Sequence, residues 1–162
     1  PDYNVYNKIV VIRDVRDVYV SLYFHRLNEQ GLHSDSFNLS DFKRFIDNEY
    51  HNPKSVSRNW SDYYVSCDEA HVLKYEELCD DPFFALQEFF VVNKFDDFSV
   101  GRLDDAIERC SFDNKRTLAS ISDRKFLRSG GHGKWRDYFD DEALSSVATK
   151  HLKIMNRFGY IV

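Results

Sequence analysis

Four consecutive β-branched residues, Ile9 to Ile12, form the sequence feature that most constrains the fold of this chain. A continuous apolar run of this kind is typical of a parallel strand that is covered on both faces, whereas a half-exposed strand alternates polar and apolar residues. Arg13 ends the run, and Asp14 offers an N-cap oxygen for a helix that begins at about Val15. Asp17, three residues after Asp14, completes a carboxylate variant of the capping box. The stretch therefore predicts a strand that passes directly into a helix, as in a parallel α/β sheet.

Two polar side chains lie where such a fold places its ligands. Arg13 follows the predicted strand, and open α/β sheets bind ligands at the carboxyl ends of their strands. Ser21 lies about two turns along the predicted helix. The alternative is that Arg13 only caps the strand and pairs with Asp14 or Asp17. These residues alone leave both interpretations open.

Length and composition favour one globular domain over residues 1–162. The chain contains 14 Phe and 10 Tyr, which is enough apolar material for a core without disulfides or metals. Its net charge of -5 argues against a nucleic-acid partner. Cys67, Cys79 and Cys110 are isolated and odd in number, which favours reduced thiols and a cytoplasmic location. No apolar run approaches the roughly 20 residues of a membrane span, so we expect a soluble protein without membrane contact.

The rest of the sequence predicts mainly helices. Apolar residues recur at helical spacing in segments that begin near residues 40, 55, 83, 100 and 141, and the last of these continues to Phe158 with Gly159 as its C-cap. Residues 70–75 are short and apolar, and predict a second strand. The six histidines show neither metal-ligand spacing nor a neighbouring nucleophile motif, so we predict no metal site and no Ser-His-Asp triad.

The strand that ends in Arg13 and the helix that carries Ser21 resemble part of the sulfotransferases that use 3'-phosphoadenosine-5'-phosphosulfate. In that family a strand ends in Arg, and the following helix supplies a Ser eight residues later. The resemblance implies that Arg13 and Ser21 hold the 3'-phosphate of this cofactor. The chemistry is suitable, because a guanidinium can hold phosphate oxygens with two bonds and a hydroxyl can donate one more.

Two further segments resemble the family's adenine site. Tyr75 to Leu78 reads Tyr-Glu-Glu-Leu and precedes Asp81-Pro82, as in the family's Tyr-Glu-Asp-Leu segment, whose Tyr contacts adenine. Phe112 follows a Ser, and in the family the ring at this place lies against adenine, as an aromatic face can for any base. The alternatives are structural. Tyr75 could simply end a strand, Asp81-Pro82 could begin a helix, and Phe112 could be a buried residue between two helices.

The fourth segment, residues 126–139, is the most specific. Arg128, Gly130, Gly133 and Trp135 match the family's Arg-x-Gly-x-x-Gly-x-Trp segment, whose Arg and backbone N–H groups close over the 3'-phosphate. Ser129 stands where a Lys is common, so one cationic contact is missing. The resemblance thus assigns Arg128, Ser129 and Gly130 to cofactor binding. The segment is not a nucleotide P-loop, since its glycine spacing is too short and Trp follows the Lys; a plain flexible loop is the alternative.

The resemblance implies a three-layer α/β/α fold with a parallel sheet, related to the P-loop nucleotide kinases. It also implies transfer of a sulfuryl group from the cofactor to a hydroxyl or amine of a small-molecule or glycan acceptor, without a metal. The product would be adenosine-3',5'-bisphosphate. Catalysis in this chemistry consists mainly of positioning and charge stabilisation, by analogy with phosphoryl transfer.

The family's phosphosulfate loop and general-base His lie upstream of the segment that begins at Lys8, and this sequence contains neither. Two strands are also few for a doubly wound sheet. We therefore expect the C-terminal portion of the fold, with no catalytic residues of its own, inactive without a missing N-terminal segment or a separate chain. The other interpretations are a non-catalytic module that binds adenosine-3',5'-bisphosphate, or a structural relic of the fold.

Overall fold

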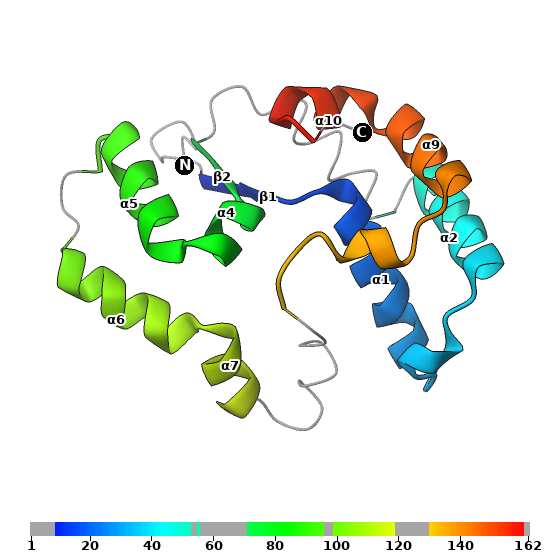
Figure 1. Cartoon of the computed structure of the whole chain (residues 1–162), viewed down its shortest axis with the longest axis horizontal. Helices are drawn as coiled ribbons and strands as arrows, with labels where there is room; N and C mark the ends of the chain where they lie inside the picture. The colour runs from blue at the N-terminus through cyan, green and yellow to red at the C-terminus, as the bar shows by residue number, and fades with distance from the viewer. Residues whose placement is uncertain (1–8, 53–54, 56–70, 96–98, 119–129, 161–162) are drawn as a thin grey trace, which may run out of the picture. The chain divides into compact units, whose positions relative to one another are not determined.

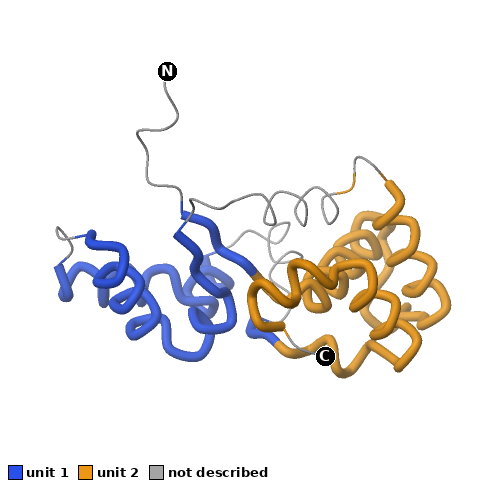
Figure 2. The backbone as a smooth tube through the Cα atoms, turned by 90° about the horizontal axis from the view of Figure 1, so that it is seen from above, with its two compact units in different colours: residues 1–12, 70–132 blue, residues 13–69, 133–162 orange. Residues whose placement is uncertain are grey.

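The computed structural model of the chain describes residues 9–52, 55, 71–95, 99–118 and 130–160. The chain divides into two compact units, which Figure 2 shows in different colours. Unit 1 comprises residues 1–12 and 70–132, and unit 2 comprises residues 13–69 and 133–162. Each unit is thus assembled from two segments that are far apart in the sequence. The expectation of a single domain over residues 1–162 stays a prediction.

A pair of parallel strands begins unit 1. Strand β1 (Ile9–Ile12) pairs with β2 (His71–Lys74), so that Ile9 lies opposite His71 and Ile12 opposite Lys74. The two strands lie side by side in Figure 1. Parallel strands connected through helices confirm the predicted α/β class. The second strand is shorter than predicted because Tyr75 is already the first residue of a helix.

The prediction that β1 is covered on both faces is wrong for the described part of the chain. Val10 and Ile12 are buried, whereas the side chains of Ile9 and Val11 keep 50% and 45% of their surface exposed. Successive side chains of a strand point to opposite faces, and the described residues cover only one of them. A β-branched run therefore identified the strand but not its surroundings.

Four helices complete the described part of unit 1: α4 (Tyr75–Asp80), α5 (Pro82–Val92), α6 (Val100–Cys110) and α7 (Phe112–Leu118). The carboxylate of Asp81 accepts the N–H of Phe84 at 3.0 Å, and Pro82 is the first residue of α5. The structural interpretation of Asp81-Pro82 as a helix start is therefore confirmed. The buried apolar side chains of this unit are Val10, Ile12, Leu73, Ala85, Phe89 and Leu103.

Unit 2 is helical. Its α-helices are α1 (Val15–Glu29), α2 (Leu39–His51), α9 (Asp141–Lys150) and α10 (Leu152–Phe158), and two short 3-10 turns are η2 (Ser34–Ser36) and η3 (Lys134–Asp137). Helix α1 begins at Val15 as predicted, because the carboxylate of Asp14 accepts the N–H of Arg16 at 2.9 Å. Helix α2 begins earlier than predicted, because the N-cap is Asn38 rather than Ser40. The helix predicted from residue 55 lies outside the described residues except for Ser55 itself, since residues 56–70 are not described.

Aromatic rings fill the core of unit 2. The ring of Phe42 lies 5.1 Å from those of Tyr23 and Phe139, and Tyr138 lies 5.1 Å from Phe24, measured between centroids. All three pairs meet edge to face, the arrangement that the ring quadrupoles favour. Because Tyr138 and Phe139 come from the second segment of the unit, the core joins both segments.

The predicted continuous C-terminal helix is wrong, because His151 divides it into α9 and α10. The side chain of His151 is 2% exposed, and its Nε2 lies 2.9 Å from the Tyr19 hydroxyl of α1. The apolar spacing continues across the break, which is why the sequence pattern concealed it. The predicted C-cap is confirmed, since Gly159 adopts a left-handed conformation with a φ of 74°.

Candidate functional site

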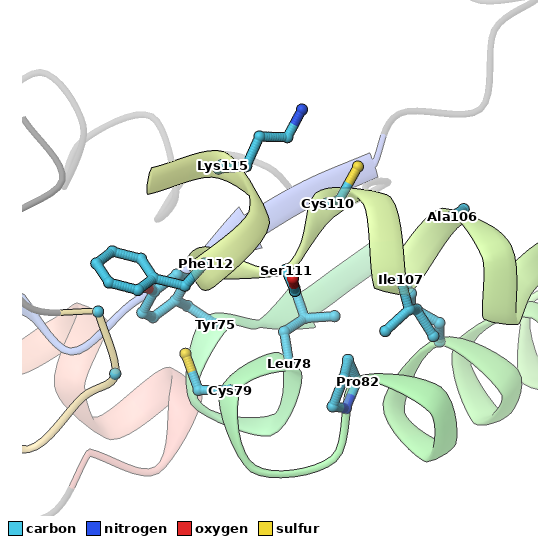
Figure 3. A pocket seen from close by; sticks show the side chains of 13 residues that line it. Tyr75, Leu78, Cys79, Pro82, Ala106, Ile107, Cys110, Ser111, Phe112 and Lys115 are labelled. Atoms are coloured by element: carbon cyan, nitrogen blue, oxygen red, sulfur yellow. The ribbon is translucent and has the colours of Figure 1, made fainter. Parts of the chain in front are cut away.

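A pocket of about 650 Å³ opens in unit 1 between helices α4, α5, α6 and α7 and the chain at Gly130 (Figure 3). This volume lies in the range of small-molecule sites, and most of its lining is apolar, as such sites require. Its lining residues are Tyr75, Leu78, Cys79, Pro82, Leu86, Ala106, Ile107, Cys110, Ser111, Phe112, Lys115, Gly130 and Gly131.

Three of the predicted site residues come together in this pocket: Tyr75, Phe112 and Gly130. Tyr75 is the first residue after β2, so it lies at the carboxyl end of a parallel strand. Phe112 is the first residue of α7 and is half-buried, unlike the buried connector of the structural alternative. Residues from three separate sequence motifs therefore line the same pocket.

Gly130 lies so close to the Phe112 ring that a side chain at this position would require the ring to shift. A Cβ atom at Gly130 would lie 3.0 Å from Cγ of Phe112, which is closer than such atoms normally approach. Gly130 also has a φ of 57°, a region that favours glycine. Both the backbone angle and the contact thus favour glycine at the position where the motif has it.

Sequence reasoning missed the other polar groups of the pocket. Lys115 lies one helical turn after Phe112, and Figure 3 shows its side chain pointing away from Leu78 and Pro82. Cys79 and Cys110, which the sequence predicted only to be reduced thiols, also line this pocket, and Cys110 is exposed. The signal for Lys115 was its i, i+3 spacing from Phe112 on a helix.

The structure describes two of the other four predicted site residues. Arg13 and Ser21 belong to unit 2, where Arg13 is partly buried and Ser21 is exposed on α1. Arg128 and Ser129 lie outside the described residues. A common site for these four residues and the pocket stays a prediction.

The second half of the glycine-rich motif lies in unit 2 and contacts the first turn of α1. Asp17 is 2% exposed, and its carboxylate accepts the N–H of Gly133 at 2.6 Å and that of Trp135 at 3.0 Å. The expected capping-box role of Asp17 is therefore wrong. Its position could have indicated a distant partner, because Asp17 leads a buried stripe of α1 that continues with Val20 and Phe24.

Arg16 contacts the same motif from the neighbouring position. Its Nη2 lies 2.6 Å from Oδ2 of Asp14, and its guanidinium carbon lies 3.9 Å from the centroid of the Trp135 ring. The guanidinium carbon of Arg136 lies 4.4 Å from the same centroid. An arginine over an indole face is a favourable cation–π contact, and Arg16 is itself buried.

Two other features are absent from the described ranges, a metal site and a membrane-spanning helix. Among those residues, no three His, Cys, Asp or Glu side chains are grouped so that they could hold a metal ion. In the same part of the chain, no helix combines the length and the apolar character that crossing a membrane requires.

Comparison with protein families gives a match over nearly the whole chain. The model of the sulfotransferase domain matches residues 4–158. Two curated proteins of Flaveria bidentis, a flavonol sulfotransferase-like protein and flavonol 3-sulfotransferase, are each 26% identical over 165 residues. The aligned part covers 86% of this chain and 51% and 52% of theirs, respectively. The chain therefore spans about half the length of the curated relatives that it matches.

A solved structure has the same fold. The crystal structure of retinol dehydratase in complex with androsterone and inactive cofactor PAP aligns with a TM-score of 0.62 at 20% identity. The alignment covers 92% of this chain and 47% of that one. At this level of identity, the likeness concerns the fold.

Proposed function

This chain belongs to the sulfotransferase family, and we propose that it supplies the half of a sulfotransferase site that binds the adenine and 3'-phosphate of 3'-phosphoadenosine-5'-phosphosulfate. The complete enzyme transfers the sulfuryl group to a hydroxyl or amine of a small-molecule or glycan acceptor. No metal is needed in this proposal. The resemblance inferred from the sequence is confirmed at the level of the family.

One observation carries the proposal: Tyr75, Phe112 and Gly130, taken from three separate motifs, line a single pocket. Aromatic faces suit a purine because stacking needs no hydrogen-bond code. The volume of about 650 Å³ is suitable for a ligand of nucleotide size. The structural relative retinol dehydratase is described with inactive cofactor PAP, which supports a ligand of this class here.

The 3'-phosphate is assigned to arginines. Because the chain carries a net charge of -5, a local cluster of cations has to attract an anionic ligand. We assign this role to Arg13 and Arg128, with a further bond from the Ser21 hydroxyl and contacts from Ser129. Charge-assisted bonds of this kind are about twice as strong as neutral ones.

The proposed reaction is an in-line displacement at sulfur. The bond between sulfur and the bridging oxygen of the 5'-phosphate breaks while the acceptor oxygen or nitrogen bonds to sulfur. Adenosine-3',5'-bisphosphate leaves with the electron pair, and the acceptor loses its proton to a general base. We assign that base, and the groups that stabilise the leaving phosphate, to no residue of this chain.

Calorimetry tests the nucleotide site by comparing adenosine-3',5'-bisphosphate with AMP, which lacks the 3'-phosphate. We expect tighter binding of the bisphosphate, and Arg13→Ala should weaken it by about 1.5–3 kcal/mol. Arg109→Ala is the matched control, because it removes an exposed arginine of α6 that does not line the pocket. A folded chain that binds both nucleotides equally, or neither, would contradict the proposal.

Turnover separates the enzyme from the second candidate, a non-catalytic binding module. The pocket itself favours neither candidate, because both would use it to bind the nucleotide. Transfer of a labelled sulfuryl group by the full-length protein to phenols, alcohols or amines would establish the enzyme. Nucleotide binding without transfer to any acceptor class would instead support the module.

A further inference from the structure

We propose that Asp17 is a positioning residue that fixes the glycine loop, residues 130–135, in the conformation that binds the nucleotide. The inference rests on the proposed function and adds a residue that the motif comparison did not assign to the site. Its physical basis lies in the contacts between the first turn of α1 and the second half of this loop.

The geometry of the contact is that of an anion in a backbone nest. Gly133 adopts a left-handed conformation with a φ of 75°, and Lys134 begins the 3-10 turn η3. Successive residues in such conformations turn their N–H groups to one side and form a concave anion site. Here the anion is the Asp17 carboxylate, with Oδ2 accepting from Gly133 at 2.6 Å and Oδ1 from Trp135 at 3.0 Å.

Because the Asp17 carboxylate is buried, it depends on its hydrogen bonds with the loop backbone. A buried carboxylate is costly unless hydrogen bonds compensate it, and Asp17 is 2% exposed. Its two N–H partners lie 116 and 118 residues later in the chain. The loop backbone thus supplies bonds that α1 needs, and α1 in turn determines where residues 133–135 lie.

Arg16 makes a second contact with residues 133–135, at Trp135. Its guanidinium is fixed by the carboxylate of Asp14, with Nε at 2.9 Å from Oδ1, and it covers the Trp135 ring. Both contacts come from the helix that starts directly after Arg13 and carries Ser21. Two of the predicted phosphate ligands, Arg13 and Ser21, therefore lie just before or on the helix that anchors the loop.

The nest also limits which part of the loop can meet the ligand. Because Asp17 occupies the N–H groups of Gly133 and Trp135, these donors are not available to a phosphate. In the described part of the loop, Gly130 and Gly131 remain, and both line the pocket together with Phe112. Three glycines give this loop high conformational freedom, and anchoring it lowers the entropy that binding would otherwise cost.

Asp17→Asn tests the inference with little change in shape. An amide has one acceptor oxygen, and its NH₂ group would face a backbone N–H. We expect faster hydrogen exchange at the amides of Gly133 and Trp135. Affinity for adenosine-3',5'-bisphosphate should fall about tenfold, the scale of one lost bond to a charged group, with a smaller change for AMP.

Asp41→Asn is the matched control. Asp41 occupies the third position of α2, as Asp17 does in α1, so both substitutions remove a carboxylate that interacts favourably with a helix dipole. Asp41 is exposed and belongs to another helix. We expect the control to leave amide exchange in the loop and nucleotide affinity unchanged.

The outcomes separate the two proposals. If the wild-type chain binds nucleotide and Asp17→Asn binds equally well, the positioning role is wrong and the proposed function stands. If the folded wild-type chain binds no nucleotide, the proposed function fails and the positioning role fails with it. Should Asp17→Asn not fold, exchange in the ligand-free wild type decides, because unprotected amides at Gly133 and Trp135 would overturn the inference.

Discussion

The two units use aromatic residues in opposite ways. In unit 2 the rings close on one another, so that Phe42 is 0% exposed and lies 5.1 Å from both Tyr23 and Phe139. In unit 1 the rings of Tyr75 and Phe112 are half-buried at a pocket of about 650 Å³. Closed rings contribute mainly to stability, and rings at a pocket keep a face for a ligand. The comparison predicts that similar substitutions in the two units have different consequences.

The largest effect is expected from Phe42→Ala in the core of unit 2. Removing a fully buried ring loses its transfer free energy and leaves a cavity, which should lower the free energy of unfolding by about 3–5 kcal/mol. Urea unfolding measures this change. A loss no greater than that of an exposed residue would show that the rings of unit 2 do not form a closed core.

Phe112→Ala should affect nucleotide binding more than stability, the reverse of Phe42→Ala. Because the ring is half-buried, we expect the free energy of unfolding to fall by about 1 kcal/mol, as for an average substitution. Binding of adenosine-3',5'-bisphosphate should weaken by about 1–3 kcal/mol, the cost of losing one stacking partner. Calorimetry and urea unfolding on the same variant separate the two quantities. A large loss of stability with unchanged binding would make Phe112 a core residue and remove the contrast.

The smallest effect is expected from alanine at Gly130 and Gly131, and comparing the two variants separates the ring contact from backbone strain. Gly130→Ala introduces a Cβ 3.0 Å from the Phe112 ring, whereas a Cβ at Gly131 meets no atom within 4 Å. Both glycines have positive φ, 57° and 70°, so each alanine should destabilise by roughly 1 kcal/mol. Only Gly130→Ala should also weaken nucleotide binding, because it displaces the ring. Equal binding by the two variants would show that the ring contact is irrelevant to the ligand.

The sequence predicted local boundaries better than distant contacts. The β-branched run and Asp14 correctly predicted the end of β1 and the start of α1, because both signals act within a few residues. The break at His151 was missed, and the buried side chain at this position contacts Tyr19, 132 residues away in sequence. Periodicity contains no information about such a partner.

The candidate site shows the same limit. Tyr75, Phe112 and Gly130 were identified by resemblance to a family, and periodicity alone would have assigned the two rings to a core. Asp17 was misinterpreted because a capping box is a local pattern, whereas its carboxylate binds backbone groups more than a hundred residues later. That any of the seven predicted residues binds the cofactor stays a prediction, and two of them, Arg128 and Ser129, lie outside the described residues.

The interleaving of the two units has a consequence for synthesis on the ribosome. A nascent chain that has emerged to residue 132 contains every segment of unit 1, including both strands. Unit 2 is then still without residues 133–162, so Tyr19 lacks His151 and Phe42 lacks Phe139. The core faces of α1 and α2 therefore stay incompletely covered while more than sixty residues of the other unit are translated. During that interval, these two helices present the apolar surface on which chaperones and non-native association act.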